Sequence, residues 1–441
     1  MSLRKQLKTR PTISRRQILI GGLIAAGAYG ATRVLGSAGN PGSLGPFSGC
    51  SGAPSAKSGD SPAQGPLRTE QAQIVDQTGK VVYLTGVSWF GMETGTFCPH
   101  GLWARNWQQM LDQIVLCGFN SIRLPYSNQV FQAGSTPNGI DFTKNPDLQG
   151  LTAIEIMDRL VHGAGQRGLR VILDRHRPDS NGQSPLWYTD HVSEQQWIAD
   201  WVMLAQRYRN EPAVIGADLH NEPHSPATWG DGNMTTDWRL AAERAGNAIL
   251  QANSDWLIIV EGIEQYNGVG YWWGGNLMGA GQFPVRLNQT DKLVYSAHDY
   301  GPGVWGQSWF SAPNFPQNLP PLWHQQWAYL VQEGIAPVWI GEFGGRSMRT
   351  DTEGIWQRSL VGYLKGNHVS YAYWCWNPNS GDTGGILEDD WLTVNQAKID
   401  VLSAYQWPLL GKPAGSVSSA SVTPTAQATA NPADQPTATC K

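Results

Sequence analysis

Apolar runs typical of buried parallel strands recur along the chain at regular intervals. They fall at 81–89, 119–126, 170–176, 214–221, 255–261, 293–300, 337–342 and 370–377. Between most of them, apolar residues follow the helical period, as at Trp107, Met110, Leu111 and Ile114. Further helices are predicted at 151–166, 197–208, 238–252, 322–333, 354–365 and 394–405. Eight strands that alternate with helices over about 330 residues predict an α/β fold, a (β/α)8 TIM barrel.

Two segments depart from this alternation. Residues 73–83 have the pattern of a small N-terminal β-hairpin, which we expect to close the N-terminal end of the barrel. Residues 262–292 are rich in glycine and lack a helical period. A long irregular loop inside a compact domain is usually functional, and this one holds four aromatic residues from Tyr266 to Trp273. We therefore interpret it as a substrate-binding loop.

The two ends of the chain differ in composition from the region between them. A basic stretch precedes the short apolar run Ile18–Ala31, and Ser14–Ile20 resembles a twin-arginine signal, which predicts export and a secreted protein. An uncleaved signal that anchors the chain in the membrane is the alternative. The predicted organisation is an export signal at 1–36, a Gly/Ser/Pro-rich linker at 37–67, the catalytic barrel at 68–412 and a disordered Ser/Thr/Pro/Ala-rich tail at 413–441.

Composition narrows the class of partner. The formal net charge is −4, and no basic cluster interleaved with aromatics occurs in the folded part, so we expect no nucleic acid. An apolar content of 41% over 441 residues supports one large core, and we expect a monomer without a stable membrane partner. Its 21 tryptophans suit both core packing and stacking on sugar rings. The five cysteines show no metal-ligand spacing, and Cys117 and Cys375 are expected to be buried free thiols.

Two glutamates stand where predicted strands end. Glu222 lies in Asp-Leu-His-Asn-Glu-Pro and Glu342 in Trp-Ile-Gly-Glu-Phe-Gly, and each string follows an apolar run. The carboxyl ends of barrel strands share one face, where barrel enzymes carry their chemistry. Two carboxyl groups held there suit the cleavage of a glycosidic bond, in which one protonates the leaving oxygen and the other meets the oxocarbenium-like carbon.

Other polar and aromatic residues end the remaining strands, and their chemistry fits the same reaction. They are Arg123, His176, Asn221, His298, Tyr300 and Trp374. A nucleophilic carboxylate must stay ionised, and Arg123 and the Tyr300 hydroxyl can stabilise its charge. The second carboxyl must be protonated near neutrality, which the charge of the first favours. Asn221 can donate to a sugar 2-hydroxyl, and Trp374 can form the floor beneath the reacting sugar.

These strings give the chain its resemblance to a known family. His100-Gly-Leu-Trp103, Ile122-Arg-Leu-Pro-Tyr126, Leu219-His-Asn-Glu-Pro-His224, Ser296-Ala-His-Asp-Tyr300 and Gly341-Glu-Phe343 occur in order across the domain. They resemble glycoside hydrolase family 5, most of all its actinobacterial endo-β-1,4-glucanases (cellulases). The resemblance implies Glu222 as general acid/base, Glu342 as nucleophile and support from Arg123, His176, Asn221, His298, Tyr300 and Trp374. It also implies a retaining, endo-acting mechanism on cellulose or related β-glucans, with no metal and no cofactor.

Substrate binding is expected to involve aromatic residues near the predicted mouth. Trp103 follows the first strand in a His-Gly context with His100, and Trp272 and Trp273 lie in the Gly-rich loop. We expect these tryptophans to stack on sugars along an open cleft of a polysaccharide-binding enzyme.

Three other interpretations remain open. The same machinery could serve a β-mannanase, xyloglucanase or licheninase. A metal-dependent barrel hydrolase could use Asp174, His176, His220 and His298, although the first strand offers Ser88-Trp-Phe where such sites usually carry His-x-His. A non-catalytic carbohydrate-binding barrel is disfavoured because both glutamates are present.

Overall fold

The computed structural model describes residues 62–413, which contain a closed barrel of parallel strands. The strand order around the barrel is β10-β11-β12-β3-β4-β5-β6-β7. The strands are β3 (Thr85–Ser88), β4 (Ser121–Ser127), β5 (Arg170–Arg177), β6 (Val214–Asp218), β7 (Leu257–Glu261), β10 (Leu293–His298), β11 (Val338–Phe343) and β12 (Ser370–Tyr373). All eight predicted strands are present, so the predicted (β/α)8 barrel is confirmed.

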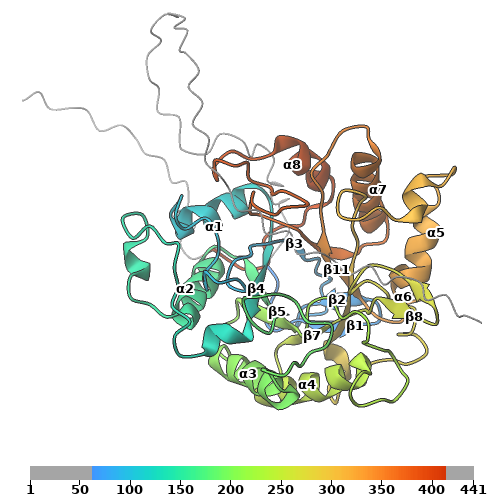
Figure 1. Cartoon of the computed structure of the whole chain (residues 1–441), viewed down its shortest axis with the longest axis horizontal. Coiled ribbons are helices and arrows are strands. Elements are labelled where there is room, and N and C mark those ends of the chain that lie inside the picture. The colour runs from blue at the N-terminus through green and yellow to red at the C-terminus, as the bar shows by residue number, and fades with distance from the viewer. Residues whose placement is uncertain (1–61, 414–441) are drawn as a thin grey trace, which may run out of the picture. The chain divides into compact units, whose positions relative to one another are not determined.

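Helices surround the strands (Figure 1). They are α1 (Trp107–Leu116), α2 (Ala153–Gln166), α3 (Glu194–Arg207), α4 (Trp238–Ala252), α5 (Leu319–Trp323), α6 (Tyr329–Gln332), α7 (Thr352–Gly366) and α8 (Gln396–Leu402). Short 3-10 turns lie at η1 (Asn128–Phe131), η2 (Pro146–Leu148), η3 (Thr290–Lys292), η4 (Ser308–Ser311) and η6 (Ser403–Tyr405). The helix predicted at 322–333 is interrupted by a π-helical segment, η5 (His324–Ala328), which the apolar period does not reveal.

Local sequence sets the starts of several helices. Asn106, Ser193 and Asp351 each accept hydrogen bonds from backbone N–H groups of the first turn of α1, α3 and α7. Thr152 and Glu155 form a capping box at the start of α2. These contacts satisfy donors that the first turn of a helix leaves without partners. The helices then bury their apolar faces against the barrel.

A hairpin and an apolar cluster close the N-terminal end of the barrel. β1 (Arg68–Glu70) pairs antiparallel with β2 (Gln73–Val75), and Val75 forms a bridge with Val81. The hairpin therefore starts about one strand earlier than the predicted range 73–83, while its function as a plug is confirmed. The plug and the strands share one cluster of buried side chains: Leu67, Ile74, Val82, Leu84, Ile172, Ile215, Leu257, Ile259, Val294, Trp339, Ala372 and Leu410.

The barrel interior changes from apolar to charged along the strands. Side chains two positions apart lie on the same face of a strand. On β5 that face carries Ile172 in the apolar cluster and then Asp174, both buried. On β7 it carries Ile259 and then Glu261, which ends the strand. The strand ends therefore bring several charged groups together above an apolar base.

Some predictions from the sequence fall at or beyond the limits of the description. The export signal, most of the linker and almost all of the tail lie outside the described residues. Ala63 and Leu67 already contact the barrel, since the Ala63 N–H donates to Leu410 O at 2.9 Å and Leu67 is buried, so the domain begins slightly before residue 68. Among the described residues, no helix is long and apolar enough to cross a bilayer.

The cysteine prediction is half correct. Cys375 is a buried free thiol, as expected. Cys117, at the C-terminal end of α1, is disulfide-bonded, so the prediction of a free thiol was wrong. An apolar sequence context suits a thiol and a half-cystine equally, so it could not distinguish them.

Candidate active site

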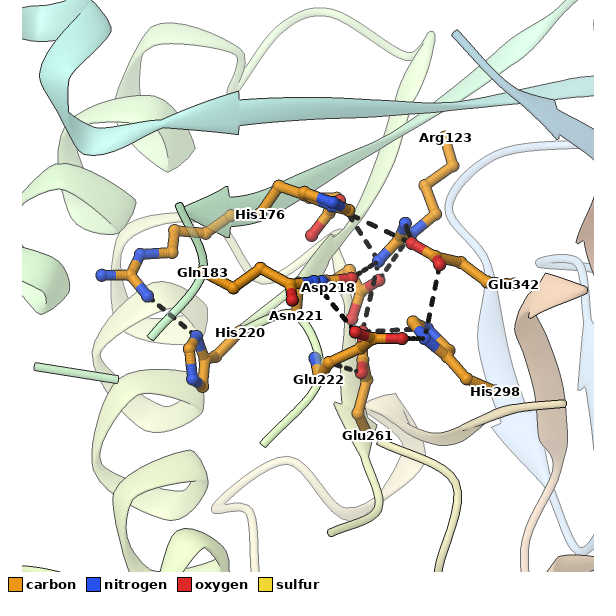
Figure 2. A network of polar contacts seen from close by, with 12 residues as sticks. Arg123, His176, Gln183, Asp218, His220, Asn221, Glu222, Glu261, His298 and Glu342 are labelled. Carbon is orange, nitrogen blue, oxygen red and sulfur yellow. Dashed lines mark hydrogen bonds and ion pairs between the residues drawn. The ribbon is translucent and has the colours of Figure 1, made fainter. Parts of the chain in front are cut away.

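The polar residues predicted at the strand ends lie together at the C-terminal end of the barrel. β4 supplies Arg123, β5 supplies His176 and β10 ends at His298. Glu222 follows β6 by a short loop, and Glu342 lies on β11. Figure 2 shows these side chains converging from separate strands. Parallel strands of a closed barrel place their carboxyl ends on one face, which explains why residues far apart in sequence meet here.

Arg123 is the centre of the network and is fully buried. Its guanidinium group binds Asp218 (Nε–Oδ2, 2.8 Å), Asn221 (Nη2–Oδ1, 2.8 Å), Glu261 (Nη2–Oε1, 3.2 Å), Asp174 (Nη2–Oδ2, 3.2 Å) and Glu342 through Nη1 and Oε1. Burial alone would lower the pKa of Arg123, but the surrounding carboxylates raise it well above its ordinary value. The arginine is therefore permanently charged and holds the carboxylates in place.

Glu342 accepts contacts at both carboxylate oxygens. Arg123 binds Oε1, and the Tyr300 hydroxyl donates to Oε2 at 2.6 Å. His298 Nδ1 lies 3.6 Å from Oε2 (Figure 2). Burial and the negative charge of Glu342 raise the pKa of Tyr300 well above its ordinary value, so the hydroxyl keeps its proton and remains a donor. These contacts hold the Glu342 carboxylate in one orientation.

Glu222 is partly exposed, and its backbone is in the left-handed region, with φ of +54°. Gln183 Nε2 donates to its Oε2 at 2.9 Å, and His298 Nδ1 lies 3.2 Å from Oε1. Burial raises the pKa of Glu222, but hydrogen bonds from His298 and Gln183 and the charge of His298 lower it below its ordinary value. In the ligand-free site these contacts therefore oppose the raised pKa that was expected for this carboxyl.

The pKa of the neighbouring histidine is shifted upward instead. Burial would lower the pKa of His298, but the charges of Glu261 and Glu342 and the hydrogen bond to Glu222 raise it well above its ordinary value. The prediction for Glu222 rested only on the repulsion between two carboxylates. It could not include a buried cationic histidine that lies against both of them.

The two glutamates face each other across this histidine. One carboxylate oxygen of Glu222, one of Glu342 and a ring nitrogen of His298 all lie within 4.8 Å of one another. Carboxyl groups about 5–5.5 Å apart are typical of retaining glycosidases, whereas inverting enzymes hold them about 6.5–9.5 Å apart.

Asn221 and Trp374 also lie in this cluster, next to Arg123 and His176 respectively. Asn221 Oδ1 is held by Arg123, while its buried Nδ2 has no hydrogen-bond partner among the described residues. A buried donor without a partner is costly, so it is suited to a ligand oxygen. Trp374 is partly exposed and stacks on His176, with ring centroids 5.3 Å apart. The His176 Nδ1 lies 2.6 Å from Asp174 Oδ2, which fixes that ring.

A series of aromatic contacts leads from Trp374 to the surface. Trp374 stacks on Phe90 at 5.4 Å, Phe90 meets His100 edge-on at 5.1 Å, and His100 lies 5.4 Å from Trp103. Trp103 is 38% exposed and is supported by the ring of Trp391 at 5.0 Å. His100 and Trp103 are therefore connected with the site, and Trp103 presents an exposed ring, as expected.

The loop at 262–292 approaches the site but does not place both tryptophans as expected. It contains the small hairpin β8 (Gln265–Tyr266) and β9 (Val269–Gly270). Trp273 is partly exposed and stacks on His224 with centroids 3.8 Å apart. Trp272 is only 7% exposed and packs against Tyr300 and Trp309, so the predicted sugar-stacking role does not fit it. A Gly-rich context predicts a loop, but it does not say which tryptophan faces the core.

The donor atoms do not form the metal site considered from the sequence. His220 faces Arg175, with Nδ1 2.8 Å from Nη1, and lies apart from the carboxylate cluster (Figure 2). Two other groups, Asp174–His176–Glu342 and Glu222–His298–Glu342, have suitably close donor atoms. However, the guanidinium group of Arg123 already contacts both Asp174 and Glu342, so their negative charges are balanced without a metal ion.

Sequence reasoning missed two residues of the network. Glu261 ends β7, and the rule that finds catalytic residues at strand ends would have found it. Gln183 lies in the loop after β5, where no pattern distinguishes it from its neighbours. Asp218 and Asp174 were noted in the motifs, but their contacts with Arg123 were not anticipated.

A closed (β/α)8 barrel with two facing glutamates at the strand ends is the arrangement of a glycoside hydrolase. Comparison with known proteins agrees with this class. The profile of cellulase (glycosyl hydrolase family 5) matches residues 75–380. The chain belongs to glycosyl hydrolase family 5.

Individual relatives support the assignment. An endoglucanase of Paenibacillus polymyxa is 55% identical over 79% of this chain and 88% of its own length. The catalytic domain of the major endoglucanase of Xanthomonas campestris pv. campestris has a solved structure that is 45% identical, with a TM-score of 0.73 over 76% of this chain and 98% of that one. An endocellulase of the archaeon Pyrococcus horikoshii is 43% identical, with a TM-score of 0.74 over 78% of this chain and 99% of that one.

Proposed function

We propose that this protein is a retaining endo-β-1,4-glucanase in which Glu342 is the nucleophile and Glu222 the general acid/base. The observation that carries the proposal is the approach of the two carboxylates to within 4.8 Å beside His298. This close approach suits direct attack by one carboxylate, as in retaining enzymes, whose carboxyl groups lie closer together than those of inverting ones. The different contacts of the two glutamates support the division of roles.

In the first step, Glu342 attacks the anomeric carbon while Glu222 protonates the glycosidic oxygen. The bond from that carbon to the leaving oxygen breaks, and a covalent glycosyl ester forms on Glu342. Arg123 and Tyr300, which bind the two oxygens of Glu342, orient the attack. The unpartnered Asn221 Nδ2 is available for the sugar 2-hydroxyl, a contact that strengthens in the transition state.

In the second step, Glu222 removes a proton from water, and the resulting hydroxide attacks the same carbon. The ester bond breaks, Glu342 returns as a carboxylate and Glu222 is again protonated. Two inversions leave the product with the β configuration of the substrate.

Endo-acting cleavage of β-1,4-glucan agrees with the names of the relatives, which are endoglucanases and an endocellulase. The Pyrococcus horikoshii endocellulase has been solved in complexes with cellotetraose. A polysaccharide of this kind would extend past Trp374 toward Trp103, along the series of aromatic rings. Trp273 is a further stacking candidate because its ring is partly exposed.

The assignment is tested by chemical rescue of two variants. With Glu342→Gly, turnover of an aryl β-cellobioside should be lost, and added azide should give the α-cellobiosyl azide. With Glu222→Ala, a substrate with a good leaving group should still react, and azide should give the β-azide. The exchanged pattern of products would reverse the roles, and an α-anomer as first product of the unmodified enzyme would exclude retention.

A further inference from the structure

One fully buried carboxylate at the barrel mouth has no part in the two steps above. Glu261 ends β7 and contacts both the acid/base and its histidine. We propose that Glu261 is a positioning residue for the acid–base step, which holds the backbone of Glu222 and supplies the charge that keeps His298 against the Glu222 carboxylate. This inference rests on the proposed function, because it assumes that Glu222 is the acid/base.

The first contact fixes the backbone of Glu222. Glu261 Oε2 accepts the Glu222 N–H at 2.7 Å. With φ of +54°, Glu222 is in a region that non-glycine residues rarely adopt, so its backbone is strained. A hydrogen bond to a charged acceptor is stronger than one between neutral groups, and it offsets this strain. Glu261 can therefore determine where the Glu222 side chain begins.

The second contact acts on the histidine beside Glu222. His298 Nε2 lies 3.2 Å from Glu261 Oε1 but makes no well-aligned hydrogen bond within the described part of the chain, so the interaction is one of charge. The other ring nitrogen, Nδ1, lies 3.2 Å from Glu222 Oε1. Glu261 thus favours the protonated ring, and that ring directs an N–H at Glu222. His298 and Glu222 then share a proton close to where the leaving oxygen must receive it.

The surroundings keep Glu261 in one position. Its Oε1 also accepts from Arg123, and its backbone carbonyl accepts from Trp238 Nε1 at 2.8 Å. Gly274 covers the other oxygen, since a Cβ placed there would be 2.3 Å from Glu261 Oε2. The φ of Gly274 is +68°, so both its space and its backbone require glycine. The close-up in Figure 2 shows Glu261 beneath Glu222 and His298.

Glutamine is the informative replacement for Glu261. Its amide has one acceptor, so it can either accept the Glu222 N–H or face the cationic groups of Arg123 and His298 with its oxygen. In either orientation the amide NH₂ group of the glutamine faces another hydrogen-bond donor. The negative charge of Glu261 is lost in both cases. We expect Glu261→Gln to impair protonation of the leaving group without preventing attack by Glu342.

The test compares two substrates that share their sugars and differ in leaving group. Phenyl β-cellobioside needs a proton on its leaving oxygen, whereas 2,4-dinitrophenyl β-cellobioside hardly does. General acid catalysis contributes about 10²- to 10⁴-fold. Glu261→Gln should therefore lower kcat/KM for the phenyl substrate by at least about 30-fold and for the dinitrophenyl substrate by less than about 3-fold. In Glu261→Gln, the second step should also be slow, because Glu222 assists it as a base. Azide, which replaces water in that step and needs no base, should therefore raise kcat for the dinitrophenyl substrate.

The matched control is Asp218→Asn. Asp218 is also fully buried and binds Arg123, but no hydrogen bond or ion pair joins it to Glu222 or His298 in the described residues. It acts through the arginine that orients Glu342, which both substrates require, so the two kcat/KM values should fall by similar factors. Gly274→Ala is a second variant that keeps the Glu261 charge but displaces its carboxylate. It should reproduce the same selective loss, and circular dichroism will show that each variant is folded.

The outcomes separate this inference from the proposed function. If Glu222→Ala shows the selective loss but folded Glu261→Gln and Gly274→Ala impair both substrates equally, the positioning role is refuted and the function stands. If Glu222→Ala itself impairs both substrates equally, the assignment of the acid/base is wrong. A selective loss in all three variants supports the inference.

Discussion

Replacing Arg123 by methionine should destabilise the protein far more at pH 7 than at pH 4. Arg123 binds Asp174, Asp218, Glu261 and Glu342, whose side chains are 0–4% exposed. Removing one partner of a buried ion pair costs about 3–5 kcal/mol, because the remaining charge is left uncompensated. Folded proteins are stable by only about 5–15 kcal/mol, so the loss at pH 7 would be a large part of the total.

The pH dependence follows from the carboxyl groups. Burial raises the pKa of Asp174 and Asp218 to about 6, although Arg123 lowers both. A carboxyl whose pKa is higher in the folded state binds more protons when folded, so stability falls as pH rises from about 4 through the folded pKa. Without Arg123 these values rise further and the fall becomes steeper. At pH 4 the groups are protonated, and the loss should be below about 2 kcal/mol.

Urea unfolding at pH 4, 5.5 and 7 measures the effect. Arg207→Met is the matched control, because Arg207 forms an ion pair with Asp158 in which both side chains are about one-third exposed (36%/35%). Exposed pairs contribute about 0–1 kcal/mol, so this variant should change little at any of the three pH values. An equal loss for Arg123→Met at pH 4 and pH 7 would refute the reasoning, since it would show that charge compensation is not what Arg123 supplies.

Three further predictions concern the surroundings of the site. Trp103→Ala should change the free energy of unfolding by no more than about 1 kcal/mol, because the ring is exposed. It should raise KM for long cello-oligosaccharides more than KM for aryl cellobiosides, and an equal change for both would contradict sugar stacking. Lys398→Met should lower the free energy of unfolding, measured with urea, by about 1–3 kcal/mol. The buried Lys398 ammonium donates to Thr383 O at 3.1 Å and to Gly385 O at 2.8 Å, and so holds the loop after β12. An unchanged unfolding midpoint would show that other contacts hold this loop. Dialysis against chelator should leave activity intact, and a loss restored by a divalent cation would revive the metal-dependent alternative.

Much of the site could be predicted because one rule places it. Residues at the carboxyl ends of parallel barrel strands meet, so Arg123, His298 and Glu342 could be grouped without any knowledge of their distances. The same rule extends to Glu261, the last residue of β7, which was not among the predicted site residues. Gln183 was beyond reach, since a loop residue's position depends on tertiary contacts.

The predictions that failed depended on side-chain environment. The burial of Trp272 is set by Tyr300 and Trp309, which come from other parts of the chain. The protonation of Glu222 depends on His298, whose charge in turn depends on Glu261. Patterns along a sequence predict which face a residue occupies, but pKa values follow from distances between residues that the pattern does not contain.

The division of the barrel interior into an apolar base and a charged mouth has a consequence for engineering. Ile172 and Ile259 belong to the base, and a charged group lies two positions further along each of these strands. Changes at well-separated positions combine additively, and repacking that conserves volume is tolerated in cores. Variants with higher thermal stability can therefore be sought at the apolar base, and variants with a different substrate preference in the loops at the mouth. Substitutions from the two searches should combine with little loss of either property.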